Sequence, residues 1–321
     1  MYEYCERSRF EIGGYIELDN YEYPLMHSDA IALNCGRNAL RYIIKAKRID
    51  RIAIPVLICD SIVDSILKED IEIVFYDVGF DFYPRLDNLD KDIWILLVNY
   101  YSQLDNNTIN GIRKIHKNII VDQSHSYFQP RIDGVDTFYT CRKYFGVPDG
   151  AFLYSNMMIN NSFERDVSFE RMTHILGRYE IGASEFYNDF QNNEDAFSSE
   201  PIKLMSKLTV NLLHGVNYKS IKNKRIANFT YLHERLGGMN RLSLACGTYM
   251  YPLYCDKASE IREKLIKKGI YIPLLWVFTI RSFDKKSTGR LLAENILPLP
   301  IDQRYDIEDM NTIVSELIDL I

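Results

Sequence analysis

The chain has 321 residues and a mass of 37.6 kDa, enough for one large domain or two of ordinary size. Lys and Arg number 38 and Asp and Glu number 44, which gives a net charge of −6. This mildly acidic balance provides no electrostatic footprint for nucleic acid or for an anionic membrane. Hydrophobic residues make up 47%, which supplies a full core and excludes an intrinsically disordered chain.

The six cysteines show neither C-x-x-C pairs nor zinc-type spacing with histidine, so no metal site is predicted. Residues Met1–Phe10 are polar and carry no secretory signal, which favours a cytoplasmic location with free thiols. The longest mostly apolar runs, Ile52–Cys59 and Tyr271–Ile280, are too short to span a bilayer. The sequence therefore predicts that the protein binds neither nucleic acid nor a membrane.

The first half of the chain alternates strand-like and helix-like stretches. Predicted strands cover Ala30–Asn34, Arg51–Cys59, Ile71–Tyr76, Asp92–Asn99, Asn118–Val121, Asp136–Thr140 and Gly150–Tyr154. Predicted helices cover Ala39–Lys47, Ser61–Lys68 and Thr108–Lys117. Strands that are continuously apolar are typical of a parallel sheet buried on both faces. The alternation predicts an α/β fold, a three-layer α/β/α domain with a mostly parallel sheet.

The second half has a different organisation. Phe163–Asn193 is polar and aromatic with helical stretches, and Pro201–Leu236 reads as one long helix or two abutting helices. The predicted elements that follow are a strand at Tyr249–Cys255, a helix at Lys257–Lys268, a strand at Ile270–Val277 and a final helix at Ile307–Ile321. This pattern favours a small C-terminal α+β domain. We place the large domain at residues 1–215 and the small one at residues 216–321.

Polar residues directly after the predicted strands are the candidates for a site, because ligands of open α/β sheets bind at the carboxyl ends of the strands. They are Gly36-Arg37-Asn38, Cys59-Asp60-Ser61, Asn99-Tyr100-Tyr101, Asp122 to His125, and Thr140 to Lys143. Gly36-Arg37-Asn38 precedes a helix, where free N–H groups and the helix dipole attract phosphate. It is also compatible with an ordinary tight turn, since no dinucleotide or P-loop motif is present.

Among the residues of these loops, Asp122 and Lys143 are the candidates for acid–base and covalent chemistry. Asp122 ends an apolar strand and either caps a helix or faces a cation such as a protonated pyridine nitrogen. Lys143 is either a solvated lysine or an amine that forms a Schiff base with an aldehyde cofactor. Its position at a strand end, downstream of that carboxylate, favours the second interpretation.

In their order along the chain, these pieces resemble the fold-type I aminotransferases that use pyridoxal 5'-phosphate. They resemble in particular the DegT/DnrJ/EryC1/StrS sugar aminotransferases. The similarity covers about residues 30–155 and 249–321, and it rests on the order in which the similar stretches follow one another. The stretches that carry it are Asn34 to Leu40, Val98 to Gln103, Ile120 to His125, Thr140 to Lys143 with Asp149-Gly150-Ala151, and Ile296 to Pro300 with Ile307-Glu308-Asp309.

The resemblance implies a role for each residue. Lys143 would bind pyridoxal 5'-phosphate covalently and carry the proton, and Asp122 would pair with the pyridine nitrogen. His125 stands where the family has a glutamine near the ring hydroxyl. The phosphate would be held by Gly36, Arg37, Asn38 and Thr140. The resemblance also implies a homodimer that transfers an amino group from an amino acid donor to a keto-sugar in nucleotide-linked form.

The sequence departs from the family at two places. No aromatic residue follows Pro55 in Val56–Cys59, where the family stacks a ring on the cofactor, and Tyr100 or Tyr101 is the candidate replacement. The family's Asn-x-Arg loop, which reaches the partner's phosphate, is replaced by Gly177–Glu194. These departures leave an alternative, a non-catalytic relative that keeps the fold as a binding or assembly module.

Overall fold

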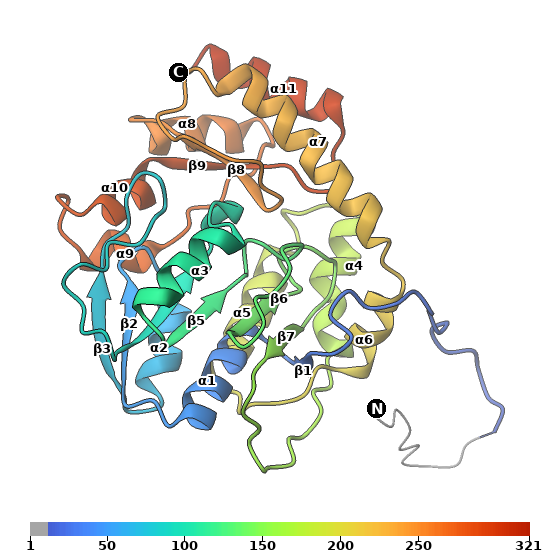
Figure 1. The fold of residues 1–321 in the computed structure, drawn as a ribbon. Coiled ribbons are helices and arrows are strands. Elements are labelled where there is room, and N and C mark those ends of the chain that lie inside the picture. The colour runs from blue at the N-terminus through green and yellow to red at the C-terminus, as the bar shows by residue number, and fades with distance from the viewer. Residues whose placement is uncertain (1–11) are drawn as a thin grey trace.

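The structure is a computed structural model that describes residues 12–321. Its centre is a seven-stranded sheet with the order β1-β7-β6-β5-β4-β2-β3 (Figure 1). The strands are β1 (Ile31–Leu33), β2 (Arg51–Pro55), β3 (Glu72–Tyr76), β4 (Trp94–Val98), β5 (Ile119–Asp122), β6 (Asp136–Thr140) and β7 (Ala151–Tyr154). The residues of β5, β6 and β7 are buried throughout, as expected of strands covered on both faces.

The direction of the strands decides which loops share an edge. Strands β2 to β6 pair in parallel, whereas β7 is antiparallel to both β6 and β1. Because β1 is antiparallel to β7 and β7 is antiparallel to β6, β1 runs in the same direction as β6. The carboxyl end of β1 therefore lies at the same edge as those of β2, β4, β5 and β6, and this is the edge at which the candidate residues follow the strands.

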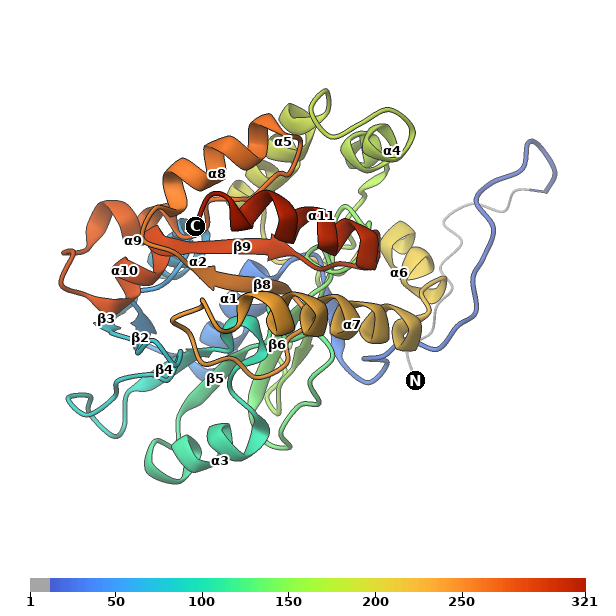
Figure 2. The ribbon, with the colours of Figure 1, turned by 90° about the horizontal axis from the view of Figure 1, so that it is seen from above.

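Helices cover both faces of the sheet. Helices α1 (Gly36–Lys47) and α2 (Asp60–Leu67) contact each other, and α1 also contacts β6 and β7. Helix α3 (Asn106–Ile115) lies on the opposite face (Figure 2). The chain moves across the sheet in one direction through α1 and α2 and in the other through α3, so right-handed crossovers place them on opposite faces. The predicted three-layer, mostly parallel fold is confirmed.

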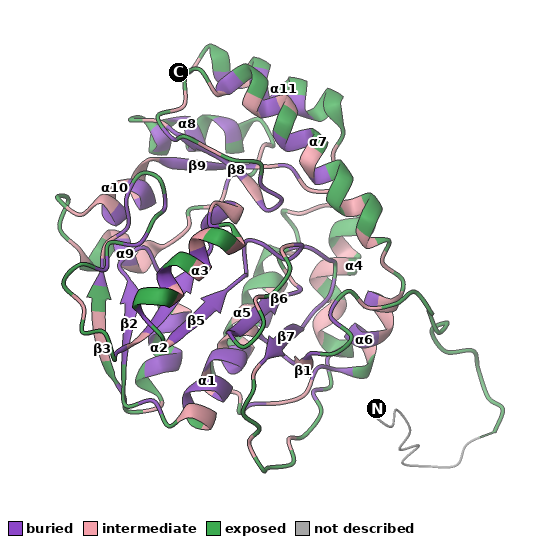
Figure 3. Cartoon of the chain, in the orientation of Figure 1, coloured by how far each residue is buried: buried purple, intermediate pink, exposed green. Residues whose placement is uncertain are grey.

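The C-terminal part builds a second, smaller layered unit. Two antiparallel strands, β8 (Met250–Tyr254) and β9 (Ile296–Pro300), contact helices α7 (Tyr218–Leu236) and α8 (Ala258–Lys267), respectively. Helix α11 (Ile307–Ile318) packs on α7. These elements bury a separate hydrophobic cluster that includes Leu232, Leu265, Leu299 and Met310 (Figure 3). The boundary between residues 215 and 216 stays a prediction.

Other helices connect these two layered parts. They are α4 (Thr173–Glu180), α5 (Tyr187–Ser199), α6 (Lys207–His214), α9 (Val277–Ser282) and α10 (Thr288–Asn295), with short 3-10 turns at Tyr100–Ser102 and Phe169–Met172. Of the two interpretations of Pro201–Leu236, the structure shows two helices, α6 and α7, which are separated at Gly215–Asn217. None of the helices within residues 12–321 is long and apolar enough to cross a membrane.

The predicted strand at Ile270–Val277 is wrong. The chain has no regular structure from Ile270 to Trp276, and α9 begins at Val277. The hydroxyl of Thr279 donates to the carbonyl oxygen of Val56 at 2.7 Å and accepts from the Ile58 amide at 3.0 Å. These bonds hold the segment against the loop after β2, and β8 pairs with β9 instead.

A buried arginine fastens the small unit to the loop that carries Lys143. Arg225 of α7 is 1% exposed and donates to the carbonyl oxygens of Thr248 at 2.8 Å, Tyr249 at 3.2 Å and Tyr144 at 3.3 Å. Its Nε donates to Gln303 at 2.9 Å. The guanidinium therefore connects backbone segments from both parts of the molecule.

We expect Arg225→Met to lower the free energy of unfolding by about 3 kcal/mol, because several buried acceptors would lose their donor. Urea denaturation measures this change. Lys224→Met is the matched control, since Lys224 is the exposed neighbour on the same helix and should leave the stability within about 0.5 kcal/mol. Equal stabilities of the two variants would show that the buried guanidinium contributes nothing.

Candidate active site

Lys143 stands three residues beyond β6, at the edge where six of the seven strands end. Its side chain is exposed to water, yet desolvation lowers its pKa. The exposure and the desolvation are compatible, because water can touch the amine itself while many protein atoms lie a little further away. The negative charges of Asp122 and Glu194 act on it and oppose this lowering of the pKa. Lys143 is therefore an accessible amine on which two carboxylates act.

Asp122 is the last residue of β5 and is 5% exposed. Its Oδ1 accepts from the Ser124 amide at 2.7 Å, and the Ser124 side chain also hydrogen-bonds the carboxylate. Burial raises the pKa of this carboxyl group, and the positive charge of Lys143 opposes the shift. The structure therefore brings the two predicted residues close enough for the charge of each to act on the pKa of the other.

His125 lies in an aromatic cluster beside Lys143. Its ring centroid is 4.1 Å from that of Tyr249, and the Lys143 Nζ is 5.2 Å from the Tyr249 ring centroid. Burial, helped by the charge of Lys143, holds the pKa of His125 well below its usual value, so the ring is neutral at pH 7. Sequence reasoning missed Tyr249, because nothing near position 249 distinguishes it from the other tyrosines.

The loop after β4 is strained where it meets His125. Tyr101 and Ser102 have φ angles of 51° and 66°, in the left-handed region that costs non-glycine residues energy. In return, the Ser102 hydroxyl donates to the His125 carbonyl oxygen at 3.0 Å. The rings of Tyr100 and Tyr101 are buried, and the Tyr100 hydroxyl donates to the Leu57 carbonyl oxygen. The aromatic ring for which a contact with Lys143 is found is Tyr249.

The first turn of α1 presents backbone N–H donors at the same edge, of which those of Arg37 and Asn38 face the Cys35 thiol. The helix starts at Gly36, three residues before the predicted start, so Gly36-Arg37-Asn38 forms this turn. A Cβ at Gly36 would lie 4.0 Å from Thr140 Cβ, which places the turn beside the end of β6. The amides of these three residues donate to no oxygen among residues 12–321. The Thr140 side chain stands at the end of β6, and no hydrogen bond of its hydroxyl is found in that range.

The side chain of Asn38 is already engaged. Its Nδ2 donates to Asn34 Oδ1 at 2.9 Å and to the Pro201 carbonyl oxygen at 2.8 Å, while its Oδ1 accepts from Arg41 at 3.0 Å. Asn38 can therefore offer a ligand only its backbone amide.

Two arginines of the edge converge on one carboxylate. Arg37 donates to the carbonyl oxygen of Glu194 at 3.0 Å and to its Oε2 at 3.1 Å. Arg142 binds both carboxylate oxygens of Glu194, which belongs to α5. Sequence reasoning did not assign Glu194 a role. The available signal was its place in Gly177–Glu194, the segment that replaces the family's loop.

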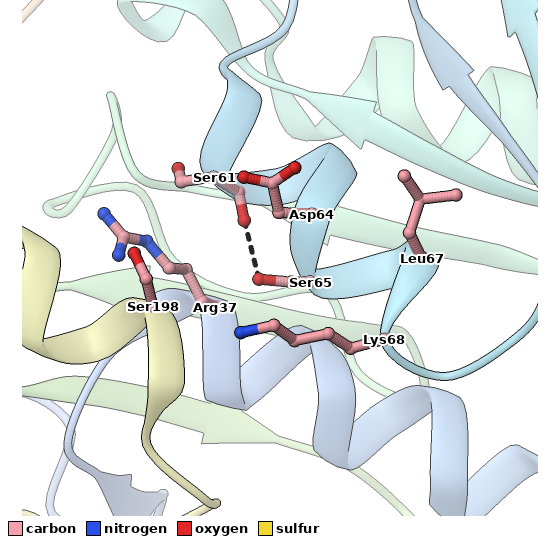
Figure 4. Close-up of a pocket in the computed structure, with 7 residues that line it drawn as sticks. All are labelled: Arg37, Ser61, Asp64, Ser65, Leu67, Lys68 and Ser198. Atoms are coloured by element: carbon pink, nitrogen blue, oxygen red, sulfur yellow. Dashed lines mark hydrogen bonds between the residues drawn. The ribbon is translucent and has the colours of Figure 1, made fainter.

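A cavity of about 480 Å³ opens on one side of Arg37. Figure 4 shows its lining, which comes from α1, α2 and α5 and consists of Arg37, Ser61, Asp64, Ser65, Leu67, Lys68 and Ser198. The cavity gives water and small solutes a route to the guanidinium of Arg37.

The comparisons with known proteins agree with this geometry at the level of fold. No protein-family model matches the chain, and no curated protein sequence does. Among solved structures it is similar to a DegT DnrJ EryC1 StrS aminotransferase from Brucella abortus. The identity is 16%, with 91% of this chain and 85% of that one covered and a TM-score of 0.62. The chain has the aminotransferase fold.

Other solved structures with the aminotransferase fold are equally similar. The sugar aminotransferase CalS13 from Micromonospora echinospora is 12% identical, with coverage of 92% and 88% and a TM-score of 0.61. The PLP-form of the putative sugar aminotransferase Spr1654 from Streptococcus pneumoniae is 16% identical, with coverage of 90% and 87% and a TM-score of 0.60. The fold therefore extends over nearly the whole chain.

Proposed function

We propose that the protein is an aminotransferase that uses pyridoxal 5'-phosphate and transfers an amino group from an amino acid to a keto-sugar. The observation that carries the proposal is the pairing of Lys143 with Asp122 at the strand ends of an aminotransferase fold. The amine is accessible, its pKa is lowered, and the carboxylate is near enough for its charge to act on the amine. Amine and acid are the two groups that this cofactor requires from a protein.

The polar groups of the site fit this cofactor. Among the described residues, the Asp122 carboxylate accepts hydrogen bonds only from Ser124, and no hydrogen bond of the Thr140 hydroxyl is found. The amides of the first turn of α1 donate to no oxygen, and those of Arg37 and Asn38 face the Cys35 thiol. A carboxylate suits a protonated pyridine nitrogen, and helix amides with a hydroxyl suit a phosphate. The groups proposed to hold the cofactor are Lys143, Asp122, His125 and Thr140, the amides of Gly36 and Asn38, and Arg37.

Each residue has a task that follows from its surroundings. When bound, pyridoxal 5'-phosphate supplies an electron sink that stabilises negative charge on the substrate carbon next to nitrogen. Lys143 Nζ moves a proton to and from that carbon, because its lowered pKa keeps more of the amine neutral. Asp122 would hold a proton on the pyridine nitrogen of the bound cofactor. Neutral His125 can donate or accept one hydrogen bond at the ring's edge.

The keto-sugar, in nucleotide-linked form, is proposed from the structural neighbours that are called sugar aminotransferases. The amino acid donor and the cytoplasmic location belong to the same proposal.

A homodimer is also proposed, because large hydrophobic side chains are exposed on and around α4. Val167 is 73% exposed, Phe169 65%, Tyr179 91% and Ile181 64%. Exposed apolar side chains gathered in one region mark an interface, and α5, which carries Glu194, contacts α4. Sedimentation of a monomer at micromolar concentration would contradict the dimer.

Titration of the protein with pyridoxal 5'-phosphate tests the function. We expect a visible absorbance band to appear at one cofactor per chain and to bleach when an amino donor such as glutamate is added. A protein that never takes up the cofactor is not an aminotransferase of this kind. A band that persists with a full panel of amino acids, with and without keto-sugar nucleotides, would favour the non-catalytic binding module.

A further inference from the structure

Glu194 neutralises two cations at the candidate phosphate site. Arg37 lies in the first turn of α1 and Arg142 directly precedes Lys143, yet both guanidinium groups donate to Glu194. A carboxylate held bidentately by an arginine occupies the same fork that a phosphate would use. The carboxylate of Glu194 therefore has the charge and the contacts of a bound anion.

The arrangement leaves donors unfilled. Arg142 Nε is buried without a hydrogen-bond partner among residues 12–321, and the amides of the first turn of α1 donate to no oxygen. Glu194 offers two carboxylate oxygens and one carbonyl oxygen to two guanidinium groups. A phosphate has more acceptor oxygens and a larger negative charge, so it would satisfy donors that Glu194 leaves free.

Exposure indicates which partner can move. The side chains of Arg37 and Arg142 are each 15% exposed, whereas that of Glu194 is 32% exposed. Of the three residues, Arg37 also lines the cavity on the side of α2 (Figure 4). Glu194 can thus turn toward solvent while both arginines stay in place.

We propose that Glu194 is an internal competitor for the phosphate of the ligand, and that it sets the affinity of the site for phosphate-bearing molecules by occupying Arg37 and Arg142 until the phosphate displaces it. The identity of the ligand as a cofactor rests on the proposed function, whereas the competition itself rests only on this cluster. The opposite possibility is that Glu194 orients the two arginines and helps them bind the phosphate.

The two possibilities predict opposite effects of Glu194→Gln on anion binding. If Glu194 competes, the variant binds inorganic phosphate about tenfold more tightly, because one nearby negative charge has been removed from the bound anion's surroundings. If Glu194 orients the arginines, the variant binds phosphate equally well or more weakly. Isothermal titration of the full chain with inorganic phosphate, in a buffer free of other multivalent anions, separates the two.

Glu69→Gln is the matched control. Glu69 also binds two cations, Arg41 at 2.7 Å and Lys45, and its side chain is 7% exposed, but these partners lie further along α1. This variant has the same change in net charge and should bind phosphate as the wild type does. A similar gain in Glu69→Gln would show a general charge effect and overturn the proposal. If Glu194→Gln does not fold, Glu194→Ala, which also removes the carboxylate, must show the same direction of change.

The same variants, titrated with pyridoxal 5'-phosphate, keep this proposal distinct from the proposed function. Tighter phosphate binding by Glu194→Gln, with no cofactor uptake by any form, would refute the function and support the competition. Cofactor uptake by the wild type, with no gain in phosphate or cofactor affinity in Glu194→Gln, would support the function and overturn the competition.

Discussion

Replacing Lys143 by alanine removes the visible absorbance band of the protein with pyridoxal 5'-phosphate and lowers the rate of amino-group transfer by at least about 10³-fold. The variant loses both the amine that attaches the cofactor and the base that moves the proton, and each contributes separately. Absorbance titration measures the attachment, and single-turnover reaction with an amino donor measures the rate.

The control for this experiment is Lys264→Ala. Lys264 is an exposed lysine of α8 and should have no influence on either readout. A Lys143→Ala protein that keeps the band would place the attachment at another lysine and refute the site.

The pH dependence of attachment follows from the surroundings of Lys143. Its pKa is lowered, so the neutral amine is present at a lower pH than in an exposed lysine. Attachment to the protein should therefore persist to lower pH than attachment to a free lysine derivative in the same buffer.

Replacing Asp122 by asparagine should lower the rate of amino-group transfer by at least about 10²-fold while the cofactor stays attached. The amide keeps the shape of the side chain but carries no charge, so it cannot hold a proton on the pyridine nitrogen. Absorbance titration of the variant should still give one cofactor per chain, and the loss should appear in the rate.

Asp136→Asn is the matched control. Asp136 is also buried, but it begins β6 at the opposite end of the strand and pairs with Lys47 at 3.0 Å. This change should cost stability and spare the rate. Equal rates for Asp122→Asn and the wild type would remove Asp122 from the proposed chemistry.

The sequence predicted the mostly parallel sheet well because the signals of its strands are local. Apolar runs such as Ile95–Val98 and Ile119–Val121 are short, β-branched or leucine-rich, and followed by polar residues, which is typical of buried parallel strands. The position of Asp122 at a strand end could be predicted for the same reason.

Local signals failed where the partner of a segment decides its conformation. Ile270–Val277 has the composition of a strand, but the hydroxyl of Thr279 fastens the adjoining helix to Val56 and Ile58, more than two hundred residues earlier. Thr279 and Val56 share no pattern that a window along the chain can detect.

The amino-acid sequence by itself determined the alternation of strands and helices, because the periodicity of apolar side chains can be read within a short window. For the same reason it determined that Asp122 ends a strand and that Lys143 follows one. Only the tertiary structure decided that Glu194 would meet Arg37, 157 residues away, and that Tyr249 would lie beside Lys143. Such contacts depend on how whole elements pack. The sequence around each of these residues contains no local pattern that predicts its distant partner.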